Sequence, residues 1–224
     1  MTEHDPSDVL PVFPLTGSLL LPGNFLPLNI FEPRYRNLVE DALDGHRLIG
    51  MIQPLVPRND NRPDLDAEPD RPDLYAIGCV GRIEESELQE DGRYLILLRG
   101  LTRFRIDEEL PLHRGYRQVR ASTDEFKDDL VEPRRELDPA RLLAALEVFA
   151  ERHQLSFEME RLRLMPGVTL LNGLAVALPF APGEKQALLE AGDLADREEL
   201  LLSLMGMGLD EVPENPSYSP PTVN

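Results

Sequence analysis

Residues 10–45, LPVFPLTGSLLLPGNFLPLNIFEPRYRNLVEDALDG, decide how the rest of the chain can fold. Prolines interrupt the apolar residues every few positions, and this excludes one long strand because proline removes a hydrogen-bond donor from the ladder. Short strands are expected instead at residues 9–13, 19–21 and 25–31, joined by tight bends. From Pro33 the apolar residues follow helical spacing, and Gly45 suits the residue just past a helix end. This predicts one amphipathic helix that packs on the strands.

Further strand-like segments follow this helix. Residues 47–53 and 76–83 have the apolar alternation of strands, and so do residues 116–121. Residues 93–106, RYLILLRGLTRFRI, alternate over a run much longer than the usual strand of about 5–6 residues. Gly100 in the middle of this run predicts a corner where a bent strand changes sides, as small barrels require.

The composition changes after residue 122. Residues 123–137 are rich in charge and predict a linker. Residues 138–207 carry apolar residues at helical spacing between capping and breaking residues, which predicts an all-α bundle whose first helix is capped by Asp138. The ends, residues 1–8 and the proline-rich residues 208–224, are expected to be flexible. The fold class is therefore α+β, with a β-barrel domain over residues 9–122 that contains one helix and precedes the helical subdomain.

The charge balance narrows the classes of partner. The net charge is −18, which opposes binding to phosphate backbones and to anionic membrane surfaces. No apolar run reaches the roughly 18–20 residues of a membrane span, and the first residues lack the basic and apolar regions of a secretory signal. With a single cysteine the chain cannot form an internal disulfide. These features together favour a cytoplasmic protein.

Residues with reactive chemistry are scarce. The four histidines are scattered and show no metal-ligand spacing, and Cys79 lies in an apolar strand, where an inert buried thiol is expected. No serine lies in a recognisable nucleophile motif. We therefore expect no catalytic residue, no cofactor and no metal.

Three arginines, Arg99, Arg103 and Arg105, share one face of the long strand. They could form an anion site. A solvated face with weak surface ion pairs to nearby glutamates is the stronger interpretation, because such arginines usually make pairs of small value.

Several motifs, in order along the chain, resemble the N-terminal substrate-binding domain of the ATP-dependent Lon proteases. The matching segments are LPVFPL (residues 10–15), LPG (21–23), LPLNIFEPRY (26–35), IG and VGRI (77–78 and 80–83), LRGLTRFRI (98–106), LN with LA (171–172 and 174–175) and KQALLE (185–190). The resemblance extends over about residues 9–206 and implies a PUA-like β-barrel crossed by a helix. The FEPRY form of residues 31–35 resembles the stand-alone Lon-domain proteins, which lack the ATPase and peptidase domains.

Only the binding function is implied by this resemblance. A Lon ATPase needs a G-x-x-x-x-G-K-[ST] loop, but neither Lys127 nor Lys185, the two lysines of the sequence, lies in one. A Lon peptidase also needs a serine–lysine dyad, and no such motif is recognisable. The resemblance implies a non-catalytic module that recognises unfolded or damaged polypeptides in protein quality control. The partner is then an unfolded polypeptide or, alternatively, another folded protein such as a separate Lon protease.

The candidate polypeptide-binding residues are Leu20, Leu21, Pro22 and Phe25. Residues 19–21 are three consecutive leucines, so strand alternation directs at least one outward unless the helical subdomain covers it. An open barrel edge that adds a peptide strand is another route to binding. Two other classes stay open: an RNA-binding PUA-like protein, which the acidity opposes, and an enzyme with a pocket between barrel and helices.

Overall fold

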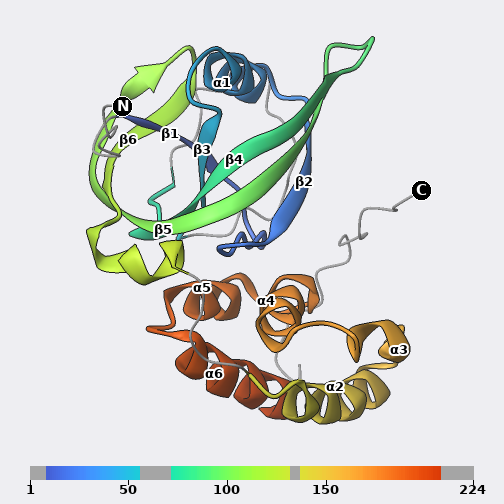
Figure 1. Cartoon of the computed structure of the whole chain (residues 1–224). Helices are drawn as coiled ribbons and strands as arrows, with labels where there is room; N and C mark the ends of the chain where they lie inside the picture. The colour runs from blue at the N-terminus through green and yellow to red at the C-terminus, as the bar shows by residue number, and fades with distance from the viewer. Residues whose placement is uncertain (1–8, 56–71, 132–136, 208–224) are drawn as a thin grey trace.

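The computed structural model describes residues 9–55, 72–131 and 137–207 (Figure 1). Residues 1–8 and 208–224, for which the sequence predicts flexibility, lie outside this part. The strands are β1 (Leu10–Pro14), β2 (Phe25–Ile30), β3 (Leu48–Ile52), β4 (Ile77–Leu88), β5 (Tyr94–His113) and β6 (Tyr116–Ser122). The helices are α1 (Pro33–Asp44), the 3-10 helix η1 (Asp124–Leu130), α2 (Pro139–His153), α3 (Met159–Leu162), α4 (Gly167–Ala177), α5 (Pro182–Glu190) and α6 (Leu194–Met207). The α+β class is confirmed.

The six strands form one sheet that closes into a ring. Their order is β2-β5-β4-β3-β1-β6, and an additional pairing joins β5 to β6. β1 and β3 are parallel, whereas the other pairs are antiparallel. The ring closes because β5 is long and strongly curved: its first residues pair with β2 and its last residues pair with β6 (Figure 1). β2 stays outside the ring as an edge strand.

Gly100 lies where β5 passes from β2 toward β6. It is paired with Gly81 of β4, next to a register shift between Val80 and Gly81. An added Cβ at Gly100 would lie 2.1 Å from the carbonyl oxygen of Leu21. The close approach of two backbones therefore requires glycine here, at the bend that the sequence predicts.

The strand predictions are wrong in three places. Residues 19–21 form a loop, and the strand expected at residues 76–83 continues as β4 to Leu88. β5 likewise runs to His113, beyond the predicted end at residue 106. Pairing supplies the reason, because Glu85, Glu87 and Leu88 each have a partner on β5, whereas no described strand pairs with residues 19–21.

α1 lies across one end of the ring (Figure 1). It begins at Pro33 and ends before Gly45, as its sequence predicts. Its apolar stripe, Tyr35, Leu38, Val39 and Ala42, is buried. The Tyr35 ring packs edge-on against the Phe13 ring with centroids 4.3 Å apart, which fixes the helix on β1.

The outer side of α1 is held by the turn between β5 and β6. The Asp41 carboxylate accepts a hydrogen bond of 2.8 Å from the Tyr116 hydroxyl and forms an ion pair with Arg114, while His113 Nε2 lies 3.5 Å away. Burial opposes ionisation of Asp41, but the hydrogen bonds from Tyr116 and Arg114 outweigh it and lower the pKa of Asp41 below its ordinary value. The ionised carboxylate therefore stabilises the native contact between α1 and the turn.

We predict that Asp41→Asn lowers the free energy of unfolding by about 1 kcal/mol near neutral pH. Since the folded-state pKa lies below the unfolded one, this contribution is present above the ordinary pKa of about 4 and is lost as the pH falls through the folded value. Urea denaturation of both proteins between about pH 3 and pH 7 measures the difference. Stability curves that stay parallel over this range would contradict the assignment.

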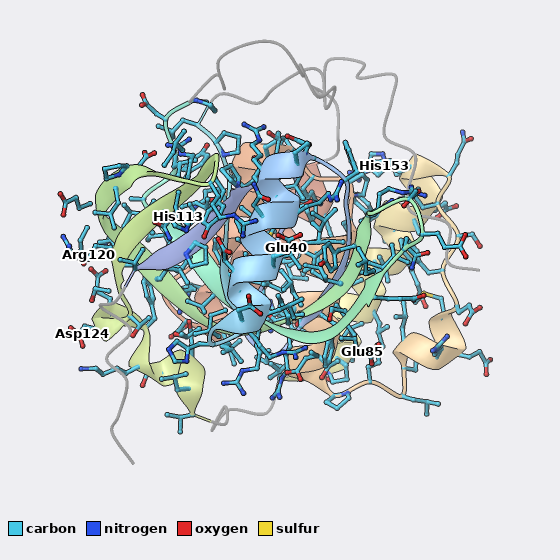
Figure 2. The ribbon with its side chains drawn as sticks, turned by 90° about the horizontal axis from the view of Figure 1, so that it is seen from above. Glu40, Glu85, His113, Arg120, Asp124 and His153 are labelled. Atoms are coloured by element: carbon cyan, nitrogen blue, oxygen red, sulfur yellow. The ribbon has the colours of Figure 1, made fainter. Side chains whose placement is uncertain are left out.

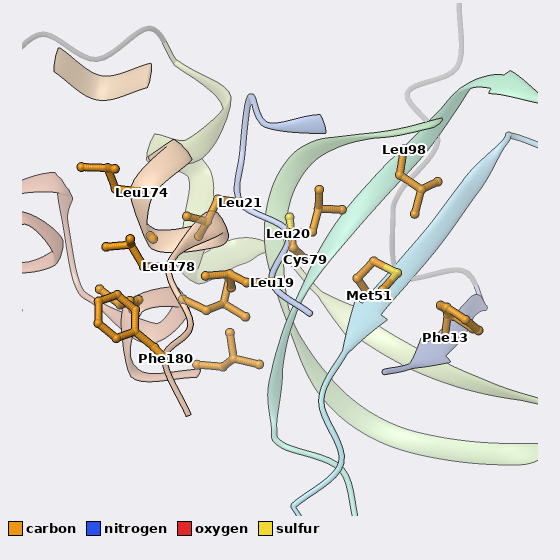
Figure 3. Packing of buried hydrophobic residues seen from close by; sticks show 14 of the residues in the cluster. Phe13, Leu19, Leu20, Leu21, Met51, Cys79, Leu98, Leu174, Leu178 and Phe180 are labelled. Carbon is orange, nitrogen blue, oxygen red and sulfur yellow. The ribbon is translucent and has the colours of Figure 1, made fainter. Parts of the chain in front are cut away.

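Helices α2 to α6, here called the helical layer, pack beneath the ring (Figure 1). Asp138 begins α2 by accepting a hydrogen bond of 2.9 Å from the Ala140 backbone, as the sequence predicts. α4 is the buried centre of the layer. Residues 123–137, expected to be a linker, contain η1, whose Phe126 is buried, and residues 132–136 lie outside the described part. One apolar core extends from inside the ring through residues 19–21 into the helical layer (Figure 3).

Candidate polypeptide-binding surface

The structure does not place the predicted binding residues on one exposed surface. Leu20 and Leu21 are 2% and 0% exposed and lie between the strands and the helical layer (Figure 3). Pro22 is partly buried beside them, whereas Phe25 is 54% exposed. Of the two alternatives for residues 19–21, an outward leucine or one covered by the helical subdomain, the structure has the second, because the helical layer covers this loop. Leu20→Asp would bury an unpaired charge and test folding instead of binding.

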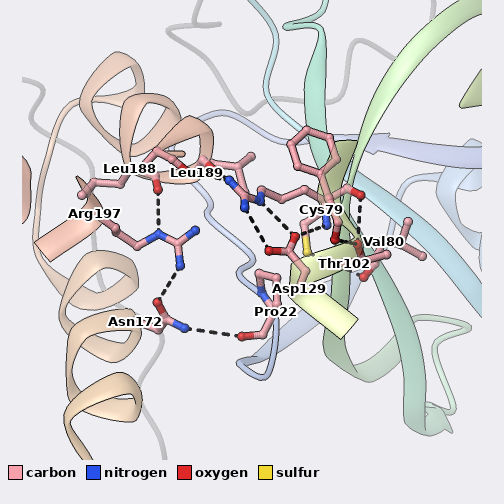
Figure 4. Close-up of polar contacts among 12 residues, drawn as sticks. Pro22, Cys79, Val80, Thr102, Asp129, Asn172, Leu188, Leu189 and Arg197 are labelled. Carbon is pink, nitrogen blue, oxygen red and sulfur yellow. Dashed lines mark hydrogen bonds and ion pairs between the residues drawn. The ribbon is translucent and has the colours of Figure 1, made fainter. Parts of the chain in front are cut away.

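Polar contacts hold the helical layer against this loop (Figure 4). Arg197 of α6 donates to the Leu188 carbonyl over 2.9 Å and to Asn172 Oδ1 over 3.0 Å. Asn172 of α4 in turn donates to the Pro22 carbonyl over 3.4 Å. Burial lowers the pKa of Arg197 to about 10, and Arg103 adds to this effect. The guanidinium still carries its charge at neutral pH, so the chain of contacts is structural.

The sequence predicts a solvated face of arginines on β5, and this is wrong for Arg103, which is buried. Its side chain is 6% exposed and binds the Asp129 carboxylate of η1 through Nε at 2.9 Å and Nη2 at 3.0 Å. Nη1 also donates to the carbonyls of Leu189 and Ala191 at the end of α5. Arg105, two residues on, does form the exposed ion pair that the sequence predicts. The covering groups come from η1 and α5, so alternation along β5 could not reveal them.

Lys185 is also buried at the junction between ring and helices. Its ammonium donates to the carbonyls of Gly17 at 3.0 Å and Val176 at 3.2 Å, and burial lowers the pKa of its ammonium. The neighbouring Gln186 donates to the Ile77 carbonyl over 3.0 Å. These contacts join α5 to the β1–β2 loop and to β4, so Lys185 has a structural role.

Phe25 belongs to a different surface, on the outside of β2 and β5. The strand register places Phe25 beside Arg99, Pro27 beside Leu97 and Asn29 beside Leu95. Their neighbours Leu26, Leu28, Ile96 and Leu98 point inward to the core. Leu95 is 43% exposed, and Leu97 is half-buried. We call the outward side chains of Phe25, Pro27, Leu95 and Leu97 the apolar face.

Sequence reasoning missed Leu95 and Leu97, although a signal was present. Both lie on the face of residues 93–106 that also carries the arginines, opposite the buried face. Two leucines at alternate positions form a contiguous apolar patch on such a face, and a contiguous patch, unlike a single exposed leucine, indicates a contact surface. What the sequence could not supply is the pairing of residues 25–30 with residues 94–99, which adds Phe25 to them.

β2 is an edge strand with a proline at its centre. Among the described strands it pairs only with β5. Proline is tolerated in an antiparallel strand when its nitrogen faces away from the partner, so Pro27 presents a gap in the donors along the free edge. The gap disfavours addition of a further strand and leaves the apolar face as the better contact surface.

Reactive groups do not gather elsewhere in the described residues. Over residues 9–55, 72–131 and 137–207, no three His, Cys, Asp or Glu side chains lie as a metal site requires. Cys79 is fully buried, and its burial raises the pKa of the thiol. No helix in the part that the structure describes is long and apolar enough to cross a membrane.

The fold and the surface define an α+β domain with an apolar sheet face held on a ring of strands. The chain belongs to the family of ATP-dependent protease La (LON) substrate-binding domains, whose profile matches residues 9–206. This match confirms the family indicated by the sequence motifs.

Relatives and solved structures agree with this assignment. Lon protease 2 of Sorangium cellulosum is 31% identical over 216 residues, which cover 91% of this chain and 25% of the protease. Lon protease 2 of Myxococcus xanthus is 29% identical and is covered to 24%. The chain thus spans about a quarter of the length of these relatives. The Lon N-terminal domain protein from Xanthomonas campestris is 29% identical with a TM-score of 0.58, covering 87% of this chain and 97% of that one.

A more distant structure shows the same fold. The N-terminal domain of the Mycobacterium avium complex Lon protease is 16% identical, with a TM-score of 0.58 over 89% of this chain and 98% of that one.

Proposed function

We propose that this chain is a non-catalytic polypeptide-binding module that recognises unfolded or damaged proteins in protein quality control. The observation that carries the proposal is the apolar face, which presents Phe25 and Leu95 to solvent on a rigid sheet in a member of the Lon substrate-binding family. Unfolded chains expose the apolar side chains that such a face can cover, whereas folded proteins bury them.

The buried cationic side chains support a binding role without catalysis. The buried lysine and arginines donate to carbonyls, an amide and Asp129, so each is occupied in holding the fold. No cofactor is required for binding of this kind. We further infer that the ring of strands is a PUA-like barrel and that the protein works in the cytoplasm, where its single buried cysteine needs no partner.

The acidic surface favours polypeptide over the other partners. Net charge −18 opposes RNA, which is held largely by Lys and Arg contacts to phosphate, and opposes anionic membranes for the same reason. A separate Lon protease is a candidate partner, to which this chain could present or deny substrates. This choice of partner is supported by the family to which the chain belongs and by its apolar face.

The test compares binding of a reduced, alkylated and therefore permanently unfolded model protein to wild type and Phe25→Ser. We expect affinity to fall about tenfold, because truncation removes an aromatic side chain from the contact. Leu164→Ser is the matched control, since Leu164 of the α3–α4 connection is 86% exposed on the helical layer. Fluorescence anisotropy gives the affinities, and urea denaturation shows that both variants fold.

The outcomes separate the surfaces. Loss of binding in Leu164→Ser with unchanged binding in Phe25→Ser would move the site to the helical layer. Absence of binding to the wild type would overturn the proposal itself.

A further inference from the structure

The end of β4 lies directly beside the apolar face and is acidic. Across β5, Glu85 is paired in register with Leu97, and Glu87 with Leu95. Residues paired in this way point to the same side of a sheet, about 5 Å apart. Two rows therefore cross the outer face, one running Glu85–Leu97–Pro27 and the other Glu87–Leu95–Asn29. Figure 2 places Glu85 at the outer surface of the strands.

These two carboxylates differ from several neighbours that form ion pairs. Glu108 and Glu109 of β5 pair with Arg120 and Arg117 of β6, and Asp91 in the turn between β4 and β5 pairs with Arg93. Within the residues that the structure describes, neither Glu85 nor Glu87 has a cationic partner. They are two positions apart on one strand, so both project to one face and repel each other. A cation brought to this edge would relieve the repulsion.

We propose that the apolar face selects polypeptide segments in which apolar residues are flanked by Lys or Arg. The inference rests on the proposed function and adds its specificity. The apolar side chains of such a segment cover Phe25, Leu95 and Leu97, while its basic side chains reach Glu85 and Glu87 one strand away. Long Lys and Arg stems suit this arrangement because they lie along apolar surface and carry the charge beyond it.

Charge also decides against a second copy of the chain as the occupant. Each copy carries a net charge of −18, and repulsion between like net charges opposes association of two copies. Arg82 and Arg99 lie on the same face in the row of Phe25, so a second copy would bring both signs of charge to the contact. A segment with apolar and basic residues would instead bring positive charges to the carboxylates of Glu85 and Glu87.

The test uses three labelled peptides with one apolar core flanked by Lys, by Ser or by Glu. For wild type at low ionic strength, we expect the Lys-flanked peptide to bind about tenfold more tightly than the Glu-flanked one, and the difference to shrink as salt is added. Glu85→Lys/Glu87→Lys should remove or reverse this preference. Glu151→Lys/Glu199→Lys is the control, since it changes the net charge equally at exposed positions of α2 and α6.

Each outcome has one meaning. Equal binding of all three peptides overturns the selectivity and leaves the proposed function standing, whereas no binding of any peptide contradicts the proposed function. A preference that survives in Glu85→Lys/Glu87→Lys would come from the overall charge and would also overturn the selectivity. Dimerisation of wild type in sedimentation that Phe25→Ser abolishes would identify a second copy as the occupant.

Discussion

Arg103→Ala should lower the free energy of unfolding by about 3–5 kcal/mol, because it leaves the buried Asp129 carboxylate without its cationic partner. Both side chains are less than a tenth exposed, and two hydrogen bonds join them. The substitution also removes the donors to the carbonyls of Leu189 and Ala191 and the cation held 4.8 Å above the Phe126 ring. The ring of strands, η1 and α5 therefore all lose a contact at one position.

The matched control is Arg105→Ala on the same strand. Arg105 pairs with Glu125, but both side chains are about half exposed, so the expected cost is at most about 1 kcal/mol. Urea denaturation followed by circular dichroism gives both values. Replacing the pair together, as Arg103→Met/Asp129→Leu, should restore most of the stability, because it leaves no unpaired charge. Equal losses in the two alanine variants would show that burial of the Arg103 pair has no energetic consequence.

The contrast between these arginines shows what the sequence alone can supply. Alternation along residues 93–106 correctly puts Arg103 and Arg105 on one face. It says nothing of what covers that face, and Asp129 and Ala191 lie 26 and 88 residues farther along the chain. Residues 19–21 are a similar case, because the side chains that bury them belong partly to helices near the end of the chain.

Local signals, in contrast, gave reliable predictions. α1 begins at Pro33 and ends before Gly45, and α2 begins after Asp138. Each of these residues sets a helix end through the backbone groups of its own turn. The family could also be identified from the order of short motifs. The apolar face could be predicted only in part: Phe25 is a candidate from the sequence, but its neighbours on β5 follow from strand register, which alternation does not fix.

Gly100→Ala should destabilise the fold by about 3–5 kcal/mol, which combines overpacking with two weakened backbone hydrogen bonds. The new Cβ would lie 2.1 Å from the Leu21 carbonyl oxygen and 2.8 Å from its carbon, so backbone atoms must move. The loop cannot withdraw freely, because Gly23 donates to the Gly100 carbonyl over 2.9 Å and Gly100 donates to the Asn24 carbonyl over 2.8 Å. The loop that the helical layer covers would thus separate from β5.

Gly173→Ala provides the matched control for Gly100→Ala. Gly173 lies inside α4 with open space around the position of a Cβ, so alanine there should raise the free energy of unfolding by up to about 1 kcal/mol through helix propensity. The two substitutions add the same methyl group, and urea denaturation should move their midpoints in opposite directions. Similar midpoints would mean that the loop at Leu21 can yield to a side chain. In that case the close backbone approach at the bend of β5 would not be what holds residues 19–21 between the strands and the helices.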